Sequence, residues 1–409
     1  MAKEYKDLVI GLDIGTAKVM VVVAEVLANG ELKLAGLGLA PSNGIKRGVV
    51  VNIEATVYSI QQALKEAELM ADCKITRVYT GITGSHIRGI NSSGMVAVKD
   101  REVSGADVAR VVETAKAINI SSDQRLLLVE PQEFIIDGQD VRQPIGMSGI
   151  RLEARVHIVT GAQTAAENII KCVRRCGLEV EHLMLNPLAS SLSVLTEDER
   201  ELGVALVDIG AGTTDVAIFT NGAIRHTAVI PIAGDLITSD IAMALRTPTK
   251  DAEDIKVESG YAKQLLADPE TQVEVPGLGD RGPRMLSRQA LAGVIEPRVE
   301  EIFSLVHQVM RDSGFEEVLS SGIVLTGGSS IMPGMVELGE DIFLKPVRRG
   351  IPKYASTLSD MVAQPRAATV MGLLEEARLA RLRGYKVAQK NGSMKTAFGQ
   401  VKDWFIGNF

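Results

Sequence analysis

The sequence predicts an α/β fold in which two duplicated domains face each other across a nucleotide cleft. The first observation is an internal repeat. Asp13-Ile14-Gly15 follows an apolar strand and precedes another, and Asp208-Ile209-Gly210 does the same about half the chain later. The second observation is length, because 409 residues allow two or more domains with a sizeable buried core. Domain duplication accounts for both.

Composition fits a soluble globular protein, with 46% hydrophobic and 23% charged residues. The net charge of −7 argues against a nucleic-acid partner. The three cysteines (Cys73, Cys172 and Cys176) are too few for a disulfide framework or a four-ligand zinc site, so we interpret them as plain thiols. Neither a secretory signal nor an apolar run of about 20 residues is visible, and we expect the protein to stay in the cytoplasm.

Apolar periodicity places the elements of the first half. We predict strands at 8–13, 19–26 and 78–81, and helices at 54–72 and 163–177. Between them, residues 84–160 differ in character, with one helix that opens on Ser104 and Asp107 in a capping-box pattern. Short strand-like stretches surround that helix at 94–98, 126–129, 133–136 and 154–159. We interpret 84–160 as a compact β/α subdomain inserted into the first half.

The second half repeats the opening pattern with a strand at 204–208. Helical pieces follow over 235–270, broken at Pro248. Residues 273–287 are rich in Gly, Pro and charge, which predicts an exposed loop. We then predict a long helix at 291–310 that Pro297 could kink, a buried strand at 323–325 and a last core helix at 367–383.

The two Asp-Ile-Gly turns are suited to bind phosphate. Glycine lets the backbone approach a ligand, and successive N–H groups then form an anion-binding nest. Each Asp stands at a strand end, suited to a hydrated Mg²⁺, which takes one or two carboxylates. The alternative is a pair of ordinary β-hairpins. We assign phosphate binding to Asp13, Gly15, Thr16, Ala17, Lys18, Asp208, Gly210, Gly212, Thr213 and Thr214, and Mg²⁺ to Asp13 and Asp208.

A third glycine turn, Gly327-Gly328-Ser329, follows the strand at 323–325. The absence of side chains there would let a flat base or a ribose lie against the backbone. Taken alone, this turn is equally well explained as a simple strand-to-helix connection. Beside the two phosphate turns, it favours an adenosine site.

Three turns in this order resemble the actin, sugar-kinase and heat-shock-chaperone ATPase superfamily. The resemblance implies an actin-like ATPase fold, with ATP as the ligand, phosphates at the first two turns and adenosine at the third. Glu253 and Lys256 are similar to the Glu-x-x-Lys contact to ribose and base in that superfamily. The alternative for this pair is an exposed i, i+3 ion pair on a helix.

Within the superfamily the chain resembles the FtsA family of bacterial cell-division proteins from residue 8 to its end. The likeness includes 196–203, 229–234 with Gly234, 238–242 and 294–298. It implies a first core subdomain (1–83 and 161–195), the inserted subdomain (84–160), a second core subdomain (196–235 and 302–383) and a small subdomain (236–301). It also implies filament formation with further copies of the chain, and recruitment of later division proteins.

The tail is an independent signal. As a helix, 394–409 gathers its apolar residues other than Ile406 within a sector of about 140°. From Arg378 onward seven Lys or Arg residues face one acidic residue, Asp403. After a linker at 384–393, such a helix suits an anionic membrane surface, although docking on the protein core is the alternative. The resemblance likewise implies an anchor to the inner face of the cytoplasmic membrane at the division site. We expect Met394, Phe398, Val401, Trp404, Phe405 and Phe409 to contact the membrane.

The loop and helix around Arg281, Arg284, Arg288 and Arg298, within the small subdomain, form a local basic cluster. The resemblance implies that this subdomain receives the acidic C-terminal tail of FtsZ, the tubulin-like ring protein. Arg284, Arg288 and Arg298 are the candidates, since guanidinium groups bind carboxylates in a bidentate manner. A solvated basic face is the alternative.

Catalysis is expected to be slow. Active ATPases of the superfamily place Gln or Glu where a water must be oriented, and the best match is Asn186, with Asp208 as the second catalytic candidate. Asn is one methylene shorter, and a displacement near 1 Å costs about a hundredfold in rate. A metabolic kinase is a second interpretation, but we identify no substrate-directed Asp outside the phosphate turns. A pilus-assembly relative is a third, although the amphipathic tail would be unexpected in it.

Overall fold

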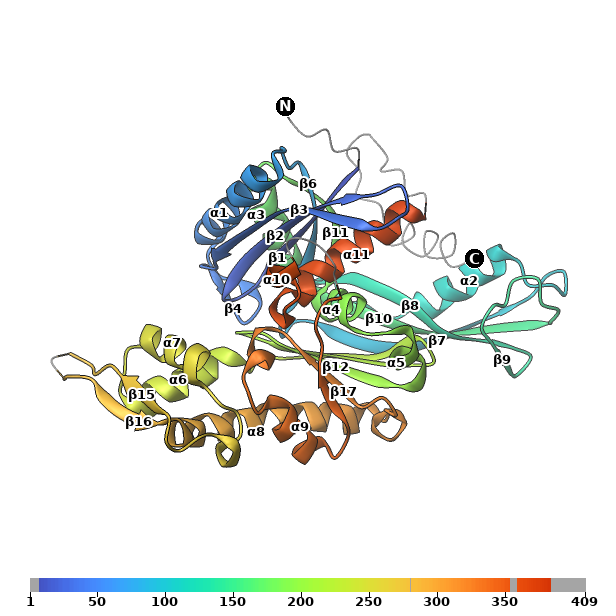
Figure 1. Ribbon diagram of the computed structural model, residues 1–409. Helices are drawn as coiled ribbons and strands as arrows, with labels where there is room; N and C mark the ends of the chain where they lie inside the picture. Colours follow the sequence, from blue (N-terminus) through green and yellow to red (C-terminus); the bar gives the residue numbers. More distant parts are fainter. Residues whose placement is uncertain (1–6, 280, 354–358, 384–409) are drawn as a thin grey trace.

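The computed structural model describes residues 7–279, 281–353 and 359–383. Two central sheets lie in neighbouring halves, and a smaller subdomain extends from each end of the molecule (Figure 1). The residues predicted as linker and membrane helix, 384–393 and 394–409, lie outside the described part.

The two central sheets have the same topology. The first runs β11-β6-β1-β2-β3 and the second β18-β17-β12-β13-β14. In each, three antiparallel strands form a meander, and two further strands add parallel to its first strand. The strands are β1 Leu8–Ile14, β2 Lys18–Val26, β3 Leu32–Pro41, β6 Arg77–Ile82, β11 Glu179–Leu185, β12 Val204–Ile209, β13 Thr214–Thr220, β14 Ala223–Ile230, β17 Ile323–Thr326 and β18 Val347–Arg349. The predicted duplication is confirmed.

Helices cover both sheets because the strands are apolar on both faces, as parallel and buried strands require. In the first half α1 (Ile53–Ala71) approaches β3 closely, and a Cβ added at Gly38 would lie 1.8 Å from the carbonyl oxygen of Ala63. Glycine is therefore required at that crossing. The other helices of the halves are α3 Gln163–Arg175, α4 Asn186–Val194, α5 Glu197–Leu202, α8 Arg288–Ser313, α9 Met335–Phe343, α10 Ser359–Val362 and α11 Ala368–Leu382.

The last helix crosses between the halves. Helix α11 packs against β1, β2 and β6 of the first sheet, where Val370 and Leu374 join the core around Val9 and Met20. The sequence-based division assigned 302–383 to the second core subdomain, and for α11 that assignment is wrong. Helical periodicity identifies a buried face but does not say which sheet it covers.

The inserted subdomain contains one sheet, β7-β10-β8-β9, with one helix on it. The predicted capping box is confirmed: Ser104 and Asp107 bond reciprocally at the start of α2 (Gly105–Lys116). The two stretches predicted at 126–129 and 133–136 are one strand, because β8 passes Pro131 through a register shift. The strands are β7 Arg88–Ala97, β8 Gln124–Ile136, β9 Gln139–Val141 and β10 Arg151–Ala162.

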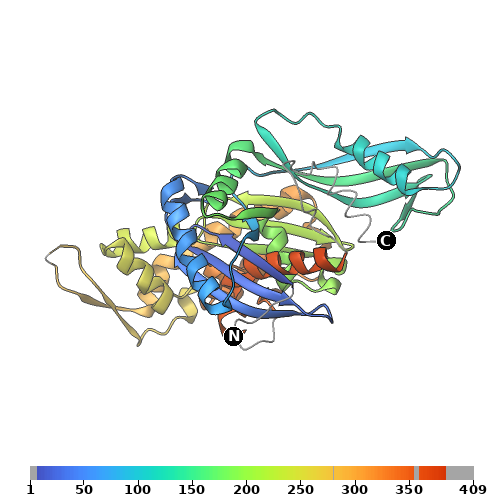
Figure 2. The same cartoon turned by 90° about the horizontal axis from the view of Figure 1, so that it is seen from above.

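The small subdomain extends from the opposite end (Figures 1 and 2). Helices α6 (Gly234–Leu245) and α7 (Thr249–Ser259) are separated at Pro248, as predicted. The exposed loop predicted at 273–287 is wrong at both ends, because β15 (Gln272–Val275) and β16 (Arg284–Ser287) pair as a hairpin. Side chains of β15 alternate between solvent and core, and burial of Val273 and Val275 stabilises the hairpin.

Helix α8 continues through Pro297 for 26 residues and packs against the second sheet and the small subdomain together. The remaining short elements are β4 Ile45–Lys46, β5 Val49–Val50, η1 Gln264–Leu266, η2 Glu316–Val318, η3 Gly328–Ile331 and η4 Pro365–Ala367. None of the helices in the described ranges is both long and apolar enough to cross a membrane.

Candidate functional site

The two Asp-Ile-Gly turns close in the same way. The N–H of Gly15 donates to the carbonyl of Lys18 at 2.9 Å, and the N–H of Gly210 donates to the carbonyl of Thr213 at 2.9 Å. Each turn joins the first two strands of its sheet, β1 to β2 and β12 to β13. The sequence repeat is thus a repeat of hairpin geometry at equivalent places in the two halves.

The two turns lie against each other. A Cβ added at Gly212 would lie 2.5 Å from Thr16 Oγ1 and 2.9 Å from Cα of Arg47. Thr16 Oγ1 also accepts a hydrogen bond from the N–H of Gly48 at 3.2 Å. Backbone N–H groups and hydroxyl groups of both halves therefore converge at one place.

The first turn holds an internal ion pair. Lys18 Nζ lies 3.1 Å from Asp13 Oδ2, and 23% of the lysine side chain and 9% of the aspartate side chain are exposed. The carbonyl of Ala17 accepts a hydrogen bond from the N–H of Ser42 at 3.0 Å. The lysine ammonium is held at the turn, close to the carboxylate proposed as a metal ligand.

The second turn holds two buried carboxylates. Burial raises the pKa of Asp208 to about 6, and the Ser190 hydroxyl, which donates to Asp208 Oδ2 at 2.5 Å, opposes this rise. Thr369 of α11 adds a second hydroxyl at 3.3 Å. Burial and the charge of Asp208 raise the pKa of Asp215 to about 7. Hydroxyl groups donate to both carboxylates, and the positive charge of Lys18 also opposes the rise in the pKa of Asp208.

Asp215 joins the halves. Its carboxylate accepts hydrogen bonds from Thr83, just after β6 of the first sheet, and from Thr213 Oγ1 at 3.2 Å. The hydroxyl of Thr214 points elsewhere and donates to the carbonyl of Ile232 at 2.8 Å. Of the two predicted threonine hydroxyls of this turn, that of Thr213 lies within the carboxylate cluster, and that of Thr214 bonds to the segment that follows β14.

The predicted adenosine turn lies beside the second phosphate turn. Ser329 Oγ donates to the carbonyl of Gly210 at 2.8 Å, and the N–H of Gly234 donates to the same carbonyl at 3.1 Å. Gly327 has φ of +85°, and a Cβ there would lie 2.4 Å from Asp208 Oδ1. Gly328 begins η3. Predicted residues that are far apart in the sequence therefore meet within hydrogen-bonding distance.

Lys256 joins this group from α7. Only 8% of Lys256 is exposed, and its Nζ donates to Glu253 Oε2 at 2.6 Å, Thr238 Oγ1 at 2.8 Å and the carbonyl of Gly234 at 3.2 Å. An exposed ion pair, the alternative for these residues, is therefore wrong for the lysine. The Glu253 side chain is 44% exposed and can still face a ligand.

Asn186 begins α4, and its Oδ1 is buried with no hydrogen-bond partner among the described residues. A Cβ added at Gly81 on β6 would lie 2.1 Å from that oxygen. The Asn186 amide therefore lies against Gly81 near the end of β6, and its Oδ1 can accept a hydrogen bond from a water.

Sequence reasoning missed the hydroxyl groups that surround the carboxylates. These hydroxyl groups come from four separate parts of the chain, and only the fold brings them to the turns: Ser190, Thr369, Thr83 and Thr238. Asp215 stands inside the second motif and could have been chosen, since its strand register places it opposite Asp208. Within the described ranges no cluster of three or more His, Cys, Asp or Glu side chains is arranged to hold a metal.

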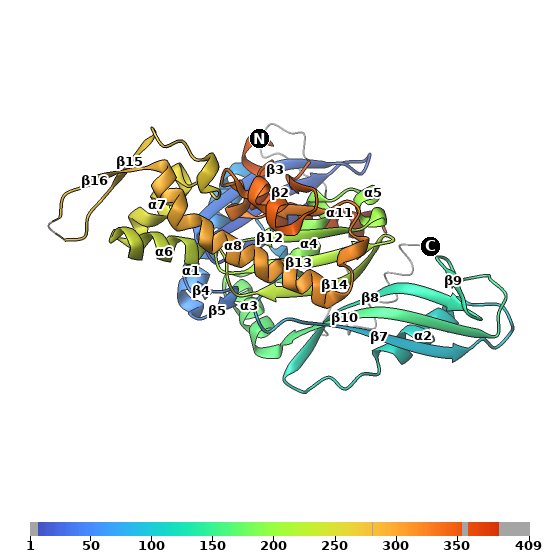
Figure 3. The same cartoon turned by 90° about the horizontal axis from the view of Figure 1, so that it is seen from below.

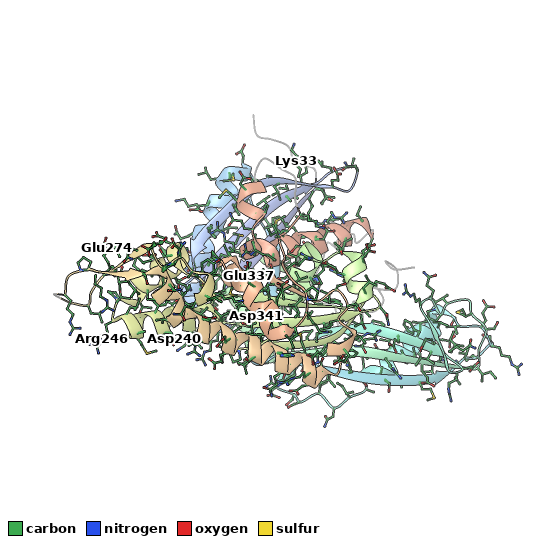
Figure 4. The ribbon with its side chains drawn as sticks, turned by 60° about the horizontal axis from the view of Figure 1, so that its bottom comes forward. Lys33, Asp240, Arg246, Glu274, Glu337 and Asp341 are labelled. Carbon is green, nitrogen blue, oxygen red and sulfur yellow. The ribbon has the colours of Figure 1, made fainter. Side chains whose placement is uncertain are left out.

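The three candidate arginines are placed differently. Arg284 on β16 donates to the carbonyl of Leu245, and Arg288 at the start of α8 donates to that of Ser259 at 3.1 Å. Arg298 lies ten residues further along α8, about 15 Å away, and makes a bidentate ion pair with Asp240 of α6 at 2.6 and 3.1 Å. Figure 4 shows Asp240 and Arg246 in this subdomain. Arg298 therefore already has a carboxylate partner within the chain.

Known proteins resemble the chain over nearly its whole length. It is 54% identical to a protein named Cell division protein FtsA from Pseudomonas aeruginosa, covering 98% of each chain. It is 46% identical to the protein of that name from Escherichia coli, covering 99% of each chain. Two family models match, "Cell division protein FtsA" over residues 205–372 and "SHS2 domain inserted in FTSA" over 84–160.

Solved structures share the fold at low identity. The PilM–PilN type IV pilus biogenesis complex matches with a TM-score of 0.65 and 18% identity, covering 90% of this chain and 98% of that one. MreB5 of Spiroplasma citri bound to ADP matches with a TM-score of 0.56 and 15% identity, covering 94% and 99%. These likenesses confirm the actin-like ATPase fold, and the pilus protein is related by fold alone. By its close relatives and its inserted domain, the chain belongs to the FtsA family of bacterial cell-division proteins.

Proposed function

We propose that this protein binds ATP between its two phosphate turns, polymerises at the inner face of the cytoplasmic membrane and tethers the FtsZ ring to it, recruiting later division proteins. The observation that carries the proposal is the contact between the turns, with a Cβ at Gly212 reaching within 2.5 Å of Thr16 Oγ1. Family membership supplies the context of cell division.

The residues at the turns fit a magnesium nucleotide. The N–H groups of Gly15 and Gly210 close the two turns, and glycine at 15, 210 and 212 leaves the other backbone N–H groups of the turns free of side-chain cover, as a phosphate nest needs. Asp13 and Asp208 lie in a group of carboxylates whose mutual repulsion a divalent cation would relieve. Gly234, Glu253, Lys256 and the Gly327-Gly328 turn would hold the adenosine. The fold relative MreB5 is described as bound to ADP and to AMPPNP, which supports a nucleotide ligand.

Hydrolysis is proposed to be slow. The unpaired, buried Oδ1 of Asn186 can accept a hydrogen bond from a water, but the shorter side chain holds that water farther back than Gln would. Nucleotide then acts as a switch for assembly. Asn186→Ala is expected to lower phosphate release at least about tenfold while changing ATP affinity less than about threefold. Equal loss of both quantities would place Asn186 in binding instead.

Self-association and FtsZ binding are the assembly functions. A structural relative described as a MamK double helical filament has the same fold, which supports polymerisation. For the acidic FtsZ tail we propose Arg284 and Arg288, and Arg298 only if the tail displaces Asp240 from its ion pair. Arg284→Ala/Arg288→Ala is expected to weaken binding of an FtsZ tail peptide about tenfold or more, measured by fluorescence anisotropy. Lys250→Ala on α7 serves as the exposed basic control.

The tail provides the membrane anchor in this proposal, and peripheral localisation at the division site follows from it. Co-sedimentation with anionic vesicles, with and without residues 394–409, tests it. Loss of binding on truncation is the expected result, because apolar anchors and cationic residues act together at such surfaces. Unchanged binding of the truncated protein would contradict the tether.

A further inference from the structure

A second basic site lies outside the nucleotide turns. A groove of about 560 Å³ lies between α3 and Arg125 at the start of β8. Gln163, Glu167, Ile170, Lys171 and Arg174 line it at helical spacing, so one face of α3 forms its wall. Its volume is in the range of small-ligand sites.

The lining is strongly positive. Arg125, Lys171, Arg174 and Arg175 face a single carboxylate, Glu167. Glu167 accepts a hydrogen bond from Gln163 at 2.7 Å, and Arg175 is ion-paired with Glu54 of α1. In the described part of the chain no ion pair is recorded for Lys171 or Arg174, and both are exposed. Their charges are available to a ligand that carries negative charge.

The basic end of α3 lies near the place where the tail leaves the fold. Helix α3 ends at Arg175 and β11 begins at Glu179. Glu181 Oε1 on β11 lies 3.7 Å from Arg381, two residues before the described chain ends at Arg383. Since a residue spans at most about 3.6 Å, Arg175 and Glu181 are within about 22 Å of each other. A membrane held by the tail is therefore within reach of this face.

The tail itself is a poor occupant of the groove. From Arg378 to the end the chain has seven Lys or Arg residues and one Asp, so its charge has the same sign as the lining. A phosphate-bearing group has the opposite sign, and guanidinium groups bind phosphate through paired N–H donors. Ile170 adds an apolar surface beside these donors, which can contact the start of an acyl chain next to a lipid headgroup.

We propose that the groove between α3 and β8 binds the headgroup of an anionic phospholipid and is a second membrane contact beside the tail. The inference rests on the proposed membrane function. Peripheral proteins commonly combine an apolar anchor with a basic patch, because either alone gives weak and reversible attachment. The second contact would fix the orientation of the first half relative to the membrane.

The test uses the full chain and two matched pairs of substitutions. Lys171→Gln/Arg174→Gln removes two charges from the groove. Lys33→Gln/Lys65→Gln removes two exposed charges from β3 and α1 of the same half, and both of its positions are solvent-facing. Affinity is measured by co-sedimentation with vesicles of phosphatidylglycerol and phosphatidylethanolamine, and with vesicles of phosphatidylcholine. On the anionic vesicles we expect the groove variant to bind about tenfold more weakly and the control pair to change less than about threefold.

A substitution of opposite sign sharpens the test. Glu167→Gln removes the one carboxylate of the lining and is expected to strengthen binding to anionic vesicles about threefold. Equal binding of the groove and control variants would overturn the inference, as would equal losses on both vesicle types. A soluble acidic peptide that fills the groove without reducing vesicle binding would also overturn the inference. That result would indicate a protein partner for the groove. Truncation at 394 tests the tether separately, so the two failures are distinguishable.

Discussion

Thr16 of the first half and Gly212 of the second lie in contact, and a Cβ at Gly212 would sit 2.5 Å from the threonine hydroxyl. The two residues belong to hairpin turns at equivalent positions of two sheets with the same topology. Their contact brings the proposed phosphate-binding groups of both turns to one place, and it connects the internal sequence repeat with the proposed binding of ATP.

Gly212→Ala is expected to weaken ATP binding by about tenfold or more, which corresponds to about 1.4 kcal/mol. The added methyl group would lie 2.5 Å from Thr16 Oγ1 and 2.9 Å from Cα of Arg47, so one of the turns or the β4–β5 hairpin has to move. Isothermal titration measures the affinity, and circular dichroism checks the fold. Gly282→Ala is the control, because a Cβ there meets nothing within 4 Å. Unchanged affinity in Gly212→Ala would mean that ATP does not use the second turn.

Lys256→Met is expected to lower the free energy of unfolding by about 2 kcal/mol, because it removes charge-assisted bonds to Glu253, Thr238 and the carbonyl of Gly234. It should also weaken ATP binding, since Gly234 loses its support. Urea unfolding with and without ATP measures both effects. Lys250→Met on the exposed side of α7 should change neither by more than about 0.5 kcal/mol, and a similar loss there would contradict a specific role.

The nucleotide-free protein is expected to lose stability as pH rises through neutrality. Burial and neighbouring charges raise the pKa of Asp215 to about 7 from 3.8. A raised pKa means that the folded state holds the proton more tightly, so this stabilisation is complete below about pH 4 and is lost as pH passes about 7.

The expected loss from Asp215 between pH 6 and 8 is about 1 kcal/mol. Asp215→Asn cannot titrate and should show a smaller decrease over that range, while histidines contribute equally to both proteins. Urea unfolding at several pH values compares them. Identical pH slopes would show that Asp215 is ionised in the folded protein well below pH 7.

Glu133→Gln is expected to destabilise the contact between the inserted subdomain and the second half. Arg225 on β14 is only 4% exposed, and its guanidinium lies 2.6 Å from Glu133 on β8. Figure 3 shows β14 alongside β8 and β10. Loss of the carboxylate leaves a buried cation, at a cost of about 2 to 3 kcal/mol after allowing for the partial exposure of Glu133.

Arg155→Gln is the matched control, because Arg155 pairs with the same Glu133 from a side chain that is 60% exposed. A surface pair of this kind contributes less than about 1 kcal/mol. Chemical denaturation compares the two variants. If both variants lose the same free energy of unfolding, the buried Arg225–Glu133 pair contributes no more to stability than the exposed pair does.

The turns could be predicted from the sequence because each is local. Gly15 and Gly210 stand next to their strands, and apolar periodicity identifies those strands without any knowledge of the fold. The same local signals located the inserted subdomain and the Ser104 cap. Pairing across long separations was harder, as the β15–β16 hairpin shows, since glycine and proline between two short strands obscured it.

The supporting residues of the site could not be predicted in this way. Ser190 and Thr369 meet at Asp208 from α4 and α11, and neither belongs to a glycine motif. The reason is topological, because α11 returns from the second half to cover the first sheet. A single sequence indicates that the face of α11 around Val370 and Leu374 is apolar but not which partner it covers.

Binding of ATP to the full-length protein, measured by isothermal titration in the presence of Mg²⁺ together with phosphate release, tests the central claim most directly. The account predicts one ATP per chain and turnover slower than about 0.01 per second, about a hundredfold below the slow end of efficient phosphoryl transfer. Absence of binding, or turnover of one per second or faster, would contradict the paired turns as a nucleotide switch.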